Sequence, residues 1–209
     1  SVNTILEMAE YKKTGTCKIL IVTGCMAQRY KEEITEEIPE VDAVLGTTSY
    51  GDIVKALNEA EAGHVFQEFK DINALPEDSG RRVITTGGHF GYLKIAEGCD
   101  KHCTYCIIPS LRGKFRSVPE ERLLKQAEYM ASQGVRELIL VAQETTVYGT
   151  DLYGKKTLHI LLKKLCQIKG IRWIRVLYCY PEEIYDELIQ VMKEEKKICH
   201  YLDLPIQHA

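Results

Sequence analysis

The sequence has no long hydrophobic run. No apolar stretch approaches the roughly 18 residues that a membrane-spanning helix requires, and the composition of 45% hydrophobic and 27% charged residues is ordinary for a globular protein. The first residues are polar and acidic where a secretory signal would carry a basic patch and an apolar core. These absences predict a cytoplasmic protein without a membrane partner.

A strong excess of positive charge is also lacking. Residues 1–80 contain 7 Lys/Arg against 15 Asp/Glu, a net charge of −8, whereas residues 81–209 contain 20 against 15, a net charge of +5. This asymmetry predicts two units with different surfaces. A net charge of +5 is too small to establish binding to nucleic acid.

The eight cysteines do not follow the pattern of a disulfide framework. Three lie close together, at Cys99, Cys103 and Cys106, and the other five are scattered along the chain. The scattered ones are Cys17, Cys25, Cys166, Cys179 and Cys199. In a reducing compartment, a compact group of cysteines indicates metal binding or catalysis. The six histidines show no ligand spacing.

Apolar strands alternate with amphipathic helices throughout the chain, which predicts parallel sheets covered by helices. The segments expected in the first unit are helices over 1–14, 28–37 and 50–60 and strands over 18–23 and 41–45. Those expected in the second unit are strands over 92–97, 137–142, 172–177 and 201–204 and helices over 119–134, 157–168 and 181–195.

The predicted fold class is α/β with two domains. Residues 1–70 form the first, residues 71–90 are a linker rich in Gly, Pro, Asp and Asn, and residues 91–209 form a partial (β/α) barrel. Four strands cannot close a barrel, and the first domain opens on a helix with no strand before it. We therefore expect the chain to be truncated at its start and after its fourth strand.

The strongest chemical signal is the spacing Cys99-x3-Cys103-x2-Cys106, directly after the first barrel strand. Three thiolates on one loop can hold three irons of a four-iron cluster, and the fourth iron is then open to substrate or cofactor. A zinc module that also uses His102 is the alternative, although no second cysteine pair follows. A ferredoxin-type carrier would place a fourth cysteine before a proline, but Ile108 precedes Pro109.

This loop, with Tyr105 before its last cysteine, resembles the radical S-adenosylmethionine (SAM) superfamily. The segments 107–113, 142–149 and 204–209, together with Gly24-Cys-Met-Ala-Gln28, resemble the methylthiotransferase family within it. Segments 143–154 and 173–181 are more similar to the ribosomal-protein-modifying RimO type than to the tRNA-modifying MiaB type. The resemblance covers nearly the whole chain.

The resemblance implies that Cys99, Cys103 and Cys106 are the catalytic cluster ligands. Their 4Fe-4S cluster would chelate SAM and reduce it to a 5′-deoxyadenosyl radical, with electrons from an external donor. Tyr105 would meet the adenine through its backbone. The segment Gln143-Glu-Thr145, at the end of the second barrel strand, would contact the methionine end of SAM; the other interpretation of this segment is a polar loop without cofactor contact.

Cys25 follows a predicted buried strand at the expected start of a helix, where the dipole favours a thiolate. By itself such a cysteine is more often a small buried hydrophobe. The resemblance instead implies that Cys25 is one ligand of an auxiliary 4Fe-4S cluster, whose other two cysteines have no match in this chain. The full-length protein would thus carry two 4Fe-4S clusters, of which this chain completely ligates one.

Several other side chains leave alternatives open. The basic group Lys101, Arg112, Lys114 and Arg116 could receive an acidic substrate, stabilise the negative charge of the cluster, or form a solvated face. Cys166 and Cys199 are expected to pack structurally. Cys179 either faces the barrel mouth or packs structurally.

The predicted function is transfer of a methylthio group to an aspartate of small-subunit ribosomal protein twelve. The first alternative is the same transfer to an adenosine of tRNA. The second is a non-enzymatic zinc or iron–sulfur interaction module.

Overall fold

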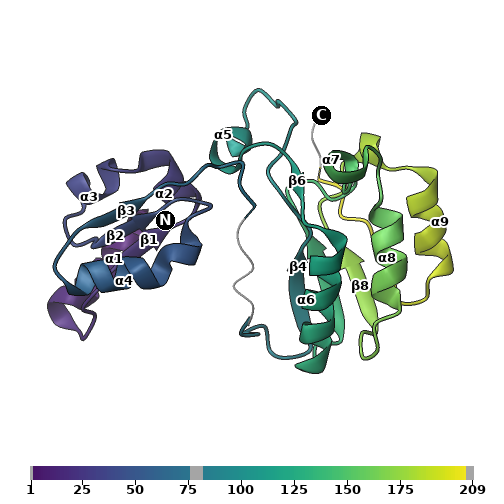
Figure 1. Ribbon diagram of the computed structural model, residues 1–209, viewed down its shortest axis with the longest axis horizontal. Helices are drawn as coiled ribbons and strands as arrows, with labels where there is room; N and C mark the ends of the chain where they lie inside the picture. The colour runs from purple at the N-terminus through teal and green to yellow at the C-terminus, as the bar shows by residue number, and fades with distance from the viewer. Residues whose placement is uncertain (1, 76–81, 206–209) are drawn as a thin grey trace. The chain divides into compact units, whose positions relative to one another are not determined.

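The computed structural model describes residues 2–75 and 82–205 and groups them into two compact units (Figure 1). The first unit contains residues 2–75 together with 102–113, and the second contains residues 82–101 and 114–205. The segment 102–113 therefore packs with the first unit although it follows the first strands of the second. No helix in the described ranges is both long and apolar enough to span a membrane.

The first unit is built on a parallel sheet of three short strands in the order β1-β2-β3. The strands are β1 (Ile21–Thr23), β2 (Ala43–Leu45) and β3 (Phe66–Glu68). Successive side chains of a strand point to opposite faces. Val44 accordingly packs into one apolar cluster, while Ala43 and Leu45 pack into another on the opposite face. β1 and β2 confirm the predicted strands, and β3 was not predicted.

Helices cover both faces of this sheet (Figure 1). They are α1 (Val2–Thr14), α2 (Cys25–Tyr30), α3 (Glu33–Glu37) and α4 (Ile53–Glu61), with the short 3₁₀ helix η1 (Tyr50–Asp52) before α4. The helix predicted over 28–37 is wrong as a single element, because Lys31 adopts a φ of 43° that ends α2. In α1, Ile5 and Ala9 are buried, whereas Val2 and Leu6 of the same apolar stripe are exposed.

The second unit has a parallel sheet in the order β4-β7-β8, which confirms the predicted βαβ repeat. Its strands are β4 (Phe90–Lys94), β7 (Glu137–Val141) and β8 (Trp173–Val176). A small antiparallel pair, β5 (Ala96–Glu97) with β6 (Arg116–Ser117), continues from β4. The structure thus confirms the predicted α/β class with parallel sheets.

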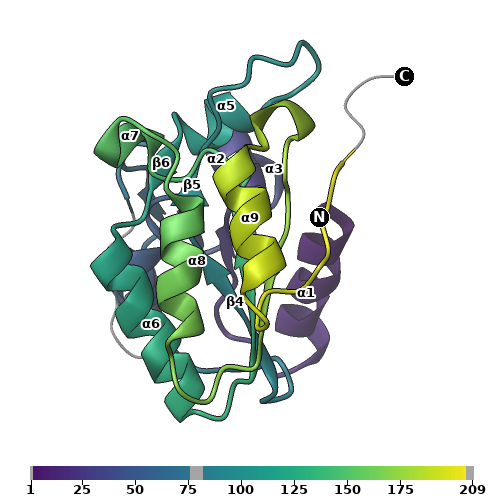
Figure 2. The ribbon, with the colours of Figure 1, turned by 90° about the vertical axis from the view of Figure 1, so that its right-hand side faces the viewer.

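Three helices cover one face of this second sheet and lie side by side in Figure 2. They are α6 (Glu120–Ser132), α8 (Leu158–Cys166) and α9 (Asp186–Glu194). Leu93, Leu138 and Ile174 are fully buried beneath them, and burying each such side chain contributes about 1.5–3 kcal/mol. The remaining short helices within residues 2–75 and 82–205 are α5 (Ile108–Arg112), α7 (Thr150–Tyr153) and η2 (Pro181–Glu183).

The fourth barrel strand, predicted over 201–204, is wrong. Residues 201–205 have no regular secondary structure, and the only strand-like contact of this region is an isolated parallel bridge between Ile174 and Ile198. Two features explain the difference. Tyr178 takes a φ of 56°, which turns the chain out of the extended conformation after β8. The carboxylate of Asp203 also accepts the Tyr178 N–H (3.0 Å), which a ladder would otherwise use.

The predicted linker 71–90 lies partly outside the described residues, as does the end of the motif 204–209. The predicted division into domains at 1–70 and 91–209 remains a prediction. Within the second unit, the parallel strands are β4, which continues into β5, and β7 and β8, and the segments that follow them lie at the carboxyl edge of the sheet. In α/β folds this edge carries the functional loops.

Candidate functional site

The three clustered cysteines occupy an irregular loop between β5 and α5. Cys99 belongs to the second unit, and Cys103 and Cys106 belong to the first, where the Cys106 N–H donates to the Cys103 carbonyl at 2.9 Å. All three are partly exposed, and none of them forms a disulfide. Within residues 2–75 and 82–205, no three Cys, His, Asp or Glu side chains are grouped as ligands of one metal ion. The ligand role of these cysteines therefore remains a prediction from their spacing.

A cavity of about 240 Å³ opens in the second unit beside Cys99. Its lining comes from the segments that follow β5, β7 and β8, together with Phe115, which directly precedes β6. The lining residues are Cys99, Asp100, Lys101, Phe115, Glu144, Val147, Thr150 and Glu183. The structure thus brings Cys99 and Glu144, both predicted site residues, to the same cavity at the carboxyl edge.

Glu144 is the buried acid of this cavity, with 3% of its surface exposed. Its Oε1 accepts hydrogen bonds from the backbone N–H of Thr146 (3.0 Å) and of Tyr180 (3.4 Å), and from the Thr146 hydroxyl. Burial nevertheless raises the pKa of the Glu144 carboxyl above its ordinary value. A cation bound in the cavity would offset the cost of keeping this carboxylate charged.

The neighbours of Glu144 have different environments. The Oε1 of Gln143 is buried and accepts no hydrogen bond from any described residue. The hydroxyl of Thr145 lies 2.8 Å from the Leu177 carbonyl and 3.0 Å from the Tyr178 carbonyl, and it donates to this pair. Gln143 thus retains an unused acceptor, whereas the Thr145 side chain joins β7 to the end of β8.

Lys101 lies in an ion-pair network that was not predicted from sequence. Its ammonium pairs with Glu183, and the ammonium of Lys156 lies 2.9 Å from the other oxygen of the same carboxylate. The hydrogen bonds from Lys101 and then from Lys156 lower the pKa of Glu183. Glu183 follows the third predicted barrel strand, and this position at the carboxyl edge was the signal that could have identified it.

Cys25 is the first residue of α2, as predicted, and lies in the first unit. The Nε–H of Arg112, in α5, donates to the Cys25 sulfur at 3.1 Å. The buried hydroxyl of Thr47 also anchors α5, because it donates to the Leu111 carbonyl at 2.9 Å. Arg112 therefore contacts a cysteine 87 residues away and does not lie on a purely solvated face.

The remaining predicted residues are spread over several environments. Tyr105 has an exposed side chain (74%), which is compatible with a contact through its backbone alone. Cys166 and Cys179 are buried, and burial raises the pKa of each thiol to about 11. Both cysteines therefore pack structurally. Arg116 donates to the carbonyl of its neighbour Lys114.

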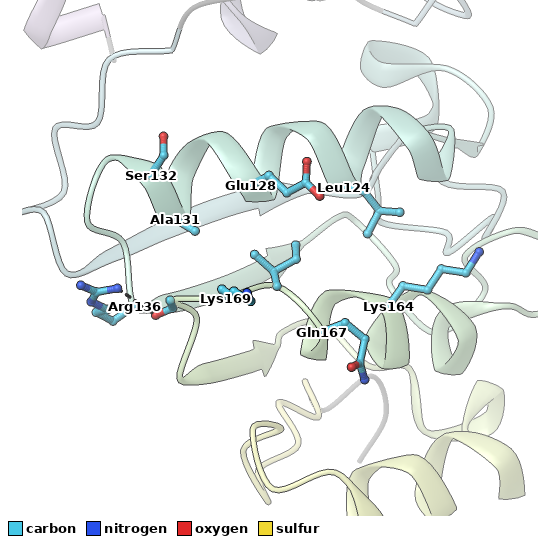
Figure 3. A pocket seen from close by; sticks show the side chains of 10 residues that line it. Leu124, Glu128, Ala131, Ser132, Arg136, Lys164, Gln167 and Lys169 are labelled. Atoms are coloured by element: carbon cyan, nitrogen blue, oxygen red, sulfur yellow. Dashed lines mark hydrogen bonds between the residues drawn. The ribbon is translucent and has the colours of Figure 1, made fainter.

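A more spacious cavity, of about 750 Å³, lies between α6 and α8 (Figure 3). Its lining includes Leu124 and Ala131 of α6, Lys164 of α8, and Arg136 and Gly170 from the loops that lead into β7 and β8. These loops mark the amino edge of the sheet, opposite the edge that carries Cys99 and Glu144. None of the predicted site residues lines this second cavity.

Comparison with known families identifies the second unit. The radical SAM superfamily matches residues 93–209, more than half of the chain, and this match contains the cysteine loop and the Glu144 cavity. The chain belongs to the radical SAM superfamily. Residues 1–46 match a second family, described as uncharacterized protein family UPF0004.

Relatives of this radical SAM chain match it from end to end. "Ribosomal protein uS12 methylthiotransferase RimO" of Lachnoclostridium phytofermentans is 66% identical over 209 residues, which are 100% of this chain and 48% of that protein. The protein of the same name from Clostridium botulinum strain Eklund 17B is 54% identical over 210 residues, covering 100% of this chain and 47% of its own. The chain spans about half the length of these curated relatives.

A solved structure supports the fold of the radical SAM chain. The radical SAM methyltransferase TsrM from Kitasatospora setae, solved with cobalamin and a [4Fe-4S] cluster, aligns with a TM-score of 0.65 at 11% identity. The alignment covers 97% of this chain and 44% of that one. At this identity the similarity establishes a shared fold and no shared substrate.

Proposed function

We propose that this chain is the cluster-binding part of a methylthiotransferase that modifies an aspartate of ribosomal protein uS12. The observation that carries the proposal is the Cys99-x3-Cys103-x2-Cys106 loop within a radical SAM match, in a chain 66% identical to a protein named for that activity. The tRNA-modifying alternative has no such support among the relatives described above. We place the reaction in the cytoplasm, with reducing electrons from an external donor.

The residues present fit an iron–sulfur cluster and SAM. Cys99, Cys103 and Cys106 are partly exposed, form no disulfide and lie on one irregular loop, and metal binding commonly orders a ligand loop of this kind. They are the proposed ligands of the 4Fe-4S cluster. When bound, that cluster supplies the electron that cleaves SAM.

The cavity residues are proposed to hold the methionine end of SAM. The buried carboxylate of Glu144 is suited to the amino group of SAM, because it can accept hydrogen bonds from the N–H bonds of that group. The orphan acceptor of Gln143 would be satisfied by a bound donor. Thr145 would act by holding this segment against the end of β8, and the backbone at Tyr105 is proposed to meet the adenine.

The second cluster is proposed on the evidence of a single residue in this chain. Cys25 opens α2, and it carries a sulfur that already accepts a charge-assisted hydrogen bond from Arg112 (3.1 Å). This contact holds the sulfur at the start of α2, and cysteine sulfur is the usual ligand of iron–sulfur clusters. The remaining ligands would come from elsewhere in the full-length protein.

The first experiment tests the cluster. The anaerobically reconstituted protein is expected to show the broad visible absorbance of an iron–sulfur cluster and about four irons per complete site. In the full-length protein, Cys103→Ala should remove the absorbance and the iron of one of the two proposed clusters, whereas Cys199→Ala, at a partly exposed cysteine outside the loop, should leave both unchanged. A colourless protein with stoichiometric zinc would support the interaction module instead.

The second experiment tests the substrate. The full-length reconstituted enzyme is given SAM, a sulfur source, a reductant and either uS12 or tRNA. A mass gain of one methylthio group on an aspartate of uS12 supports the proposal. A gain on tRNA alone would assign the chain to the tRNA-modifying branch, and binding to tRNA should then weaken steeply with salt.

A further inference from the structure

The two residues that follow Cys99 attach the cysteine loop to the second unit. The Asp100 carboxylate accepts the backbone N–H of Phe115 at 2.9 Å. The Lys101 ammonium pairs with the Glu183 carboxylate and lies 4.3 Å from the centre of the Tyr180 ring. The Cys99 end of the loop is therefore tied to two segments distant in the chain, one of which is the turn after β8.

Glu183 is the centre of this attachment. One of its oxygens accepts from Lys101 and the other lies 2.9 Å from the Lys156 ammonium, which also donates to the Glu183 backbone carbonyl at 2.8 Å. The three side chains are only 24–33% exposed, so solvent screens these pairs less than it screens an open surface pair. Lys156 thereby holds the carboxylate in place for Lys101.

This network lies directly at the cavity that contains Cys99 and Glu144. Lys101, Glu183 and Glu144 all line it. The proposed cluster ligand Cys99 and the proposed SAM contact Glu144 must keep their separation to within about 0.5 Å for SAM to bind productively. The loop itself has no regular secondary structure that could maintain this separation.

We propose that Glu183 is a positioning residue that fixes the Cys99 end of the cluster loop against the Glu144 cavity by holding Lys101. The inference rests on the proposed function, because it assigns Glu183 to the same cluster and cofactor site. Glu183 touches neither the iron nor SAM in this scheme. It acts through Lys101, with Lys156 as its support.

The test uses the full-length, cluster-loaded protein and four variants. Glu183→Gln and Lys101→Met remove the anchor. Glu182→Gln removes a neighbouring exposed carboxylate and is the matched control. Lys156→Met removes a Glu183 partner without freeing Lys101, and so reports the effect of weakening the ion-pair network alone.

Three quantities are measured: the melting temperature, the rate of iron loss to a chelator, and the SAM-dependent change in the electron paramagnetic resonance spectrum of the reduced cluster. We expect Glu183→Gln and Lys101→Met to weaken SAM binding, titrated by that spectral change, about tenfold. Tenfold corresponds to about 1.4 kcal/mol, close to the value of one hydrogen bond to a charged group. Iron loss should accelerate in the same two variants.

The outcomes separate the inference from its premise. Glu182→Gln should match the wild type, and Lys156→Met should lower the melting temperature with a smaller effect on SAM binding. If Glu183→Gln binds SAM as the wild type does, or if Lys156→Met and Glu183→Gln change all three quantities equally, the positioning role is wrong. A wild-type protein that takes up no cluster, or whose cluster does not respond to SAM, would overturn the proposed function and the inference with it.

Discussion

Replacing Gly149 by alanine should destabilise the second unit far more than the same change at Gly154. Both glycines flank α7 with left-handed backbones, at φ values of 90° and 68°. An alanine in such a backbone conformation destabilises the fold by about 1–2 kcal/mol. At Gly149 the new Cβ would also overlap the Thr157 Oγ1 and lie 3.0 Å from a Tyr153 ring carbon, whereas no atom of the described residues lies within 4 Å of a Cβ at Gly154.

Neither the Thr157 side chain nor the backbone at Gly149 can move easily to avoid the clash with an alanine Cβ at position 149. Thr157 is buried, and its β-branched side chain has few alternative rotamers. The backbone N–H of Gly149 donates to the Ser117 hydroxyl at 2.9 Å, which resists a shift of the chain. Overpacking of this kind costs about 1–3 kcal/mol. We therefore expect a total loss of about 2–5 kcal/mol for Gly149→Ala and about 1–2 kcal/mol for Gly154→Ala.

Thermal unfolding followed by fluorescence measures this difference. Trp173, the single tryptophan, lies in β8 and reports on the second unit. The extra 1–3 kcal/mol should separate the melting temperatures of the two variants by about 2–12 °C. Equal destabilisation by the two substitutions would show that the contact with Thr157 is not a constraint, and the packing described for this corner of the site would be wrong.

The remaining predictions concern ionisable groups. Burial raises the pKa of the Glu144 carboxyl, so the folded protein holds the carboxyl proton more tightly than the unfolded chain does. The protonated carboxyl therefore contributes to stability at low pH, and this contribution is lost as the pH rises through the folded pKa. Glu144→Gln should therefore be more favourable, relative to wild type, at pH 8 than at pH 5 in urea unfolding; a pH-independent difference would contradict this. Iodoacetamide should label Cys103 and Cys106 in the cluster-free native protein but reach Cys166 and Cys179 only after unfolding, as peptide mass spectrometry can determine.

The sequence by itself was sufficient for the elements whose signals are local. Pro119 and Gly134 bracket a strongly amphipathic segment, and α6 begins and ends within two residues of the predicted helix. The apolar run 137–142 is long enough to be recognised as a strand, and β7 occupies nearly all of it. The cysteine spacing needed no fold at all, because three thiols so close in the chain share one loop whatever surrounds them.

Local signals failed where longer-range contacts or backbone geometry decided the outcome. β3 has only three residues and was recognisable only through its pairing with β2. The helix over 28–37 breaks at Lys31, and residues 201–204 do not form a strand because Tyr178 and Asp203 redirect the hydrogen bonds after β8. Periodicity carries no information about such exceptions, since each depends on a single φ angle or a single side chain.

The arrangement of the candidate site was decided by tertiary structure. The charges of Lys101 and Glu183 are visible in the sequence, but 82 residues separate them, and only the parallel packing of β4, β7 and β8 brings their segments to one edge. Arg112 also reaches Cys25 only through tertiary structure, because α5 packs with the first unit. The chain's sequence therefore determined which chemistry is available, and the fold determined which side chains meet, because contacts between distant residues depend on how whole elements pack.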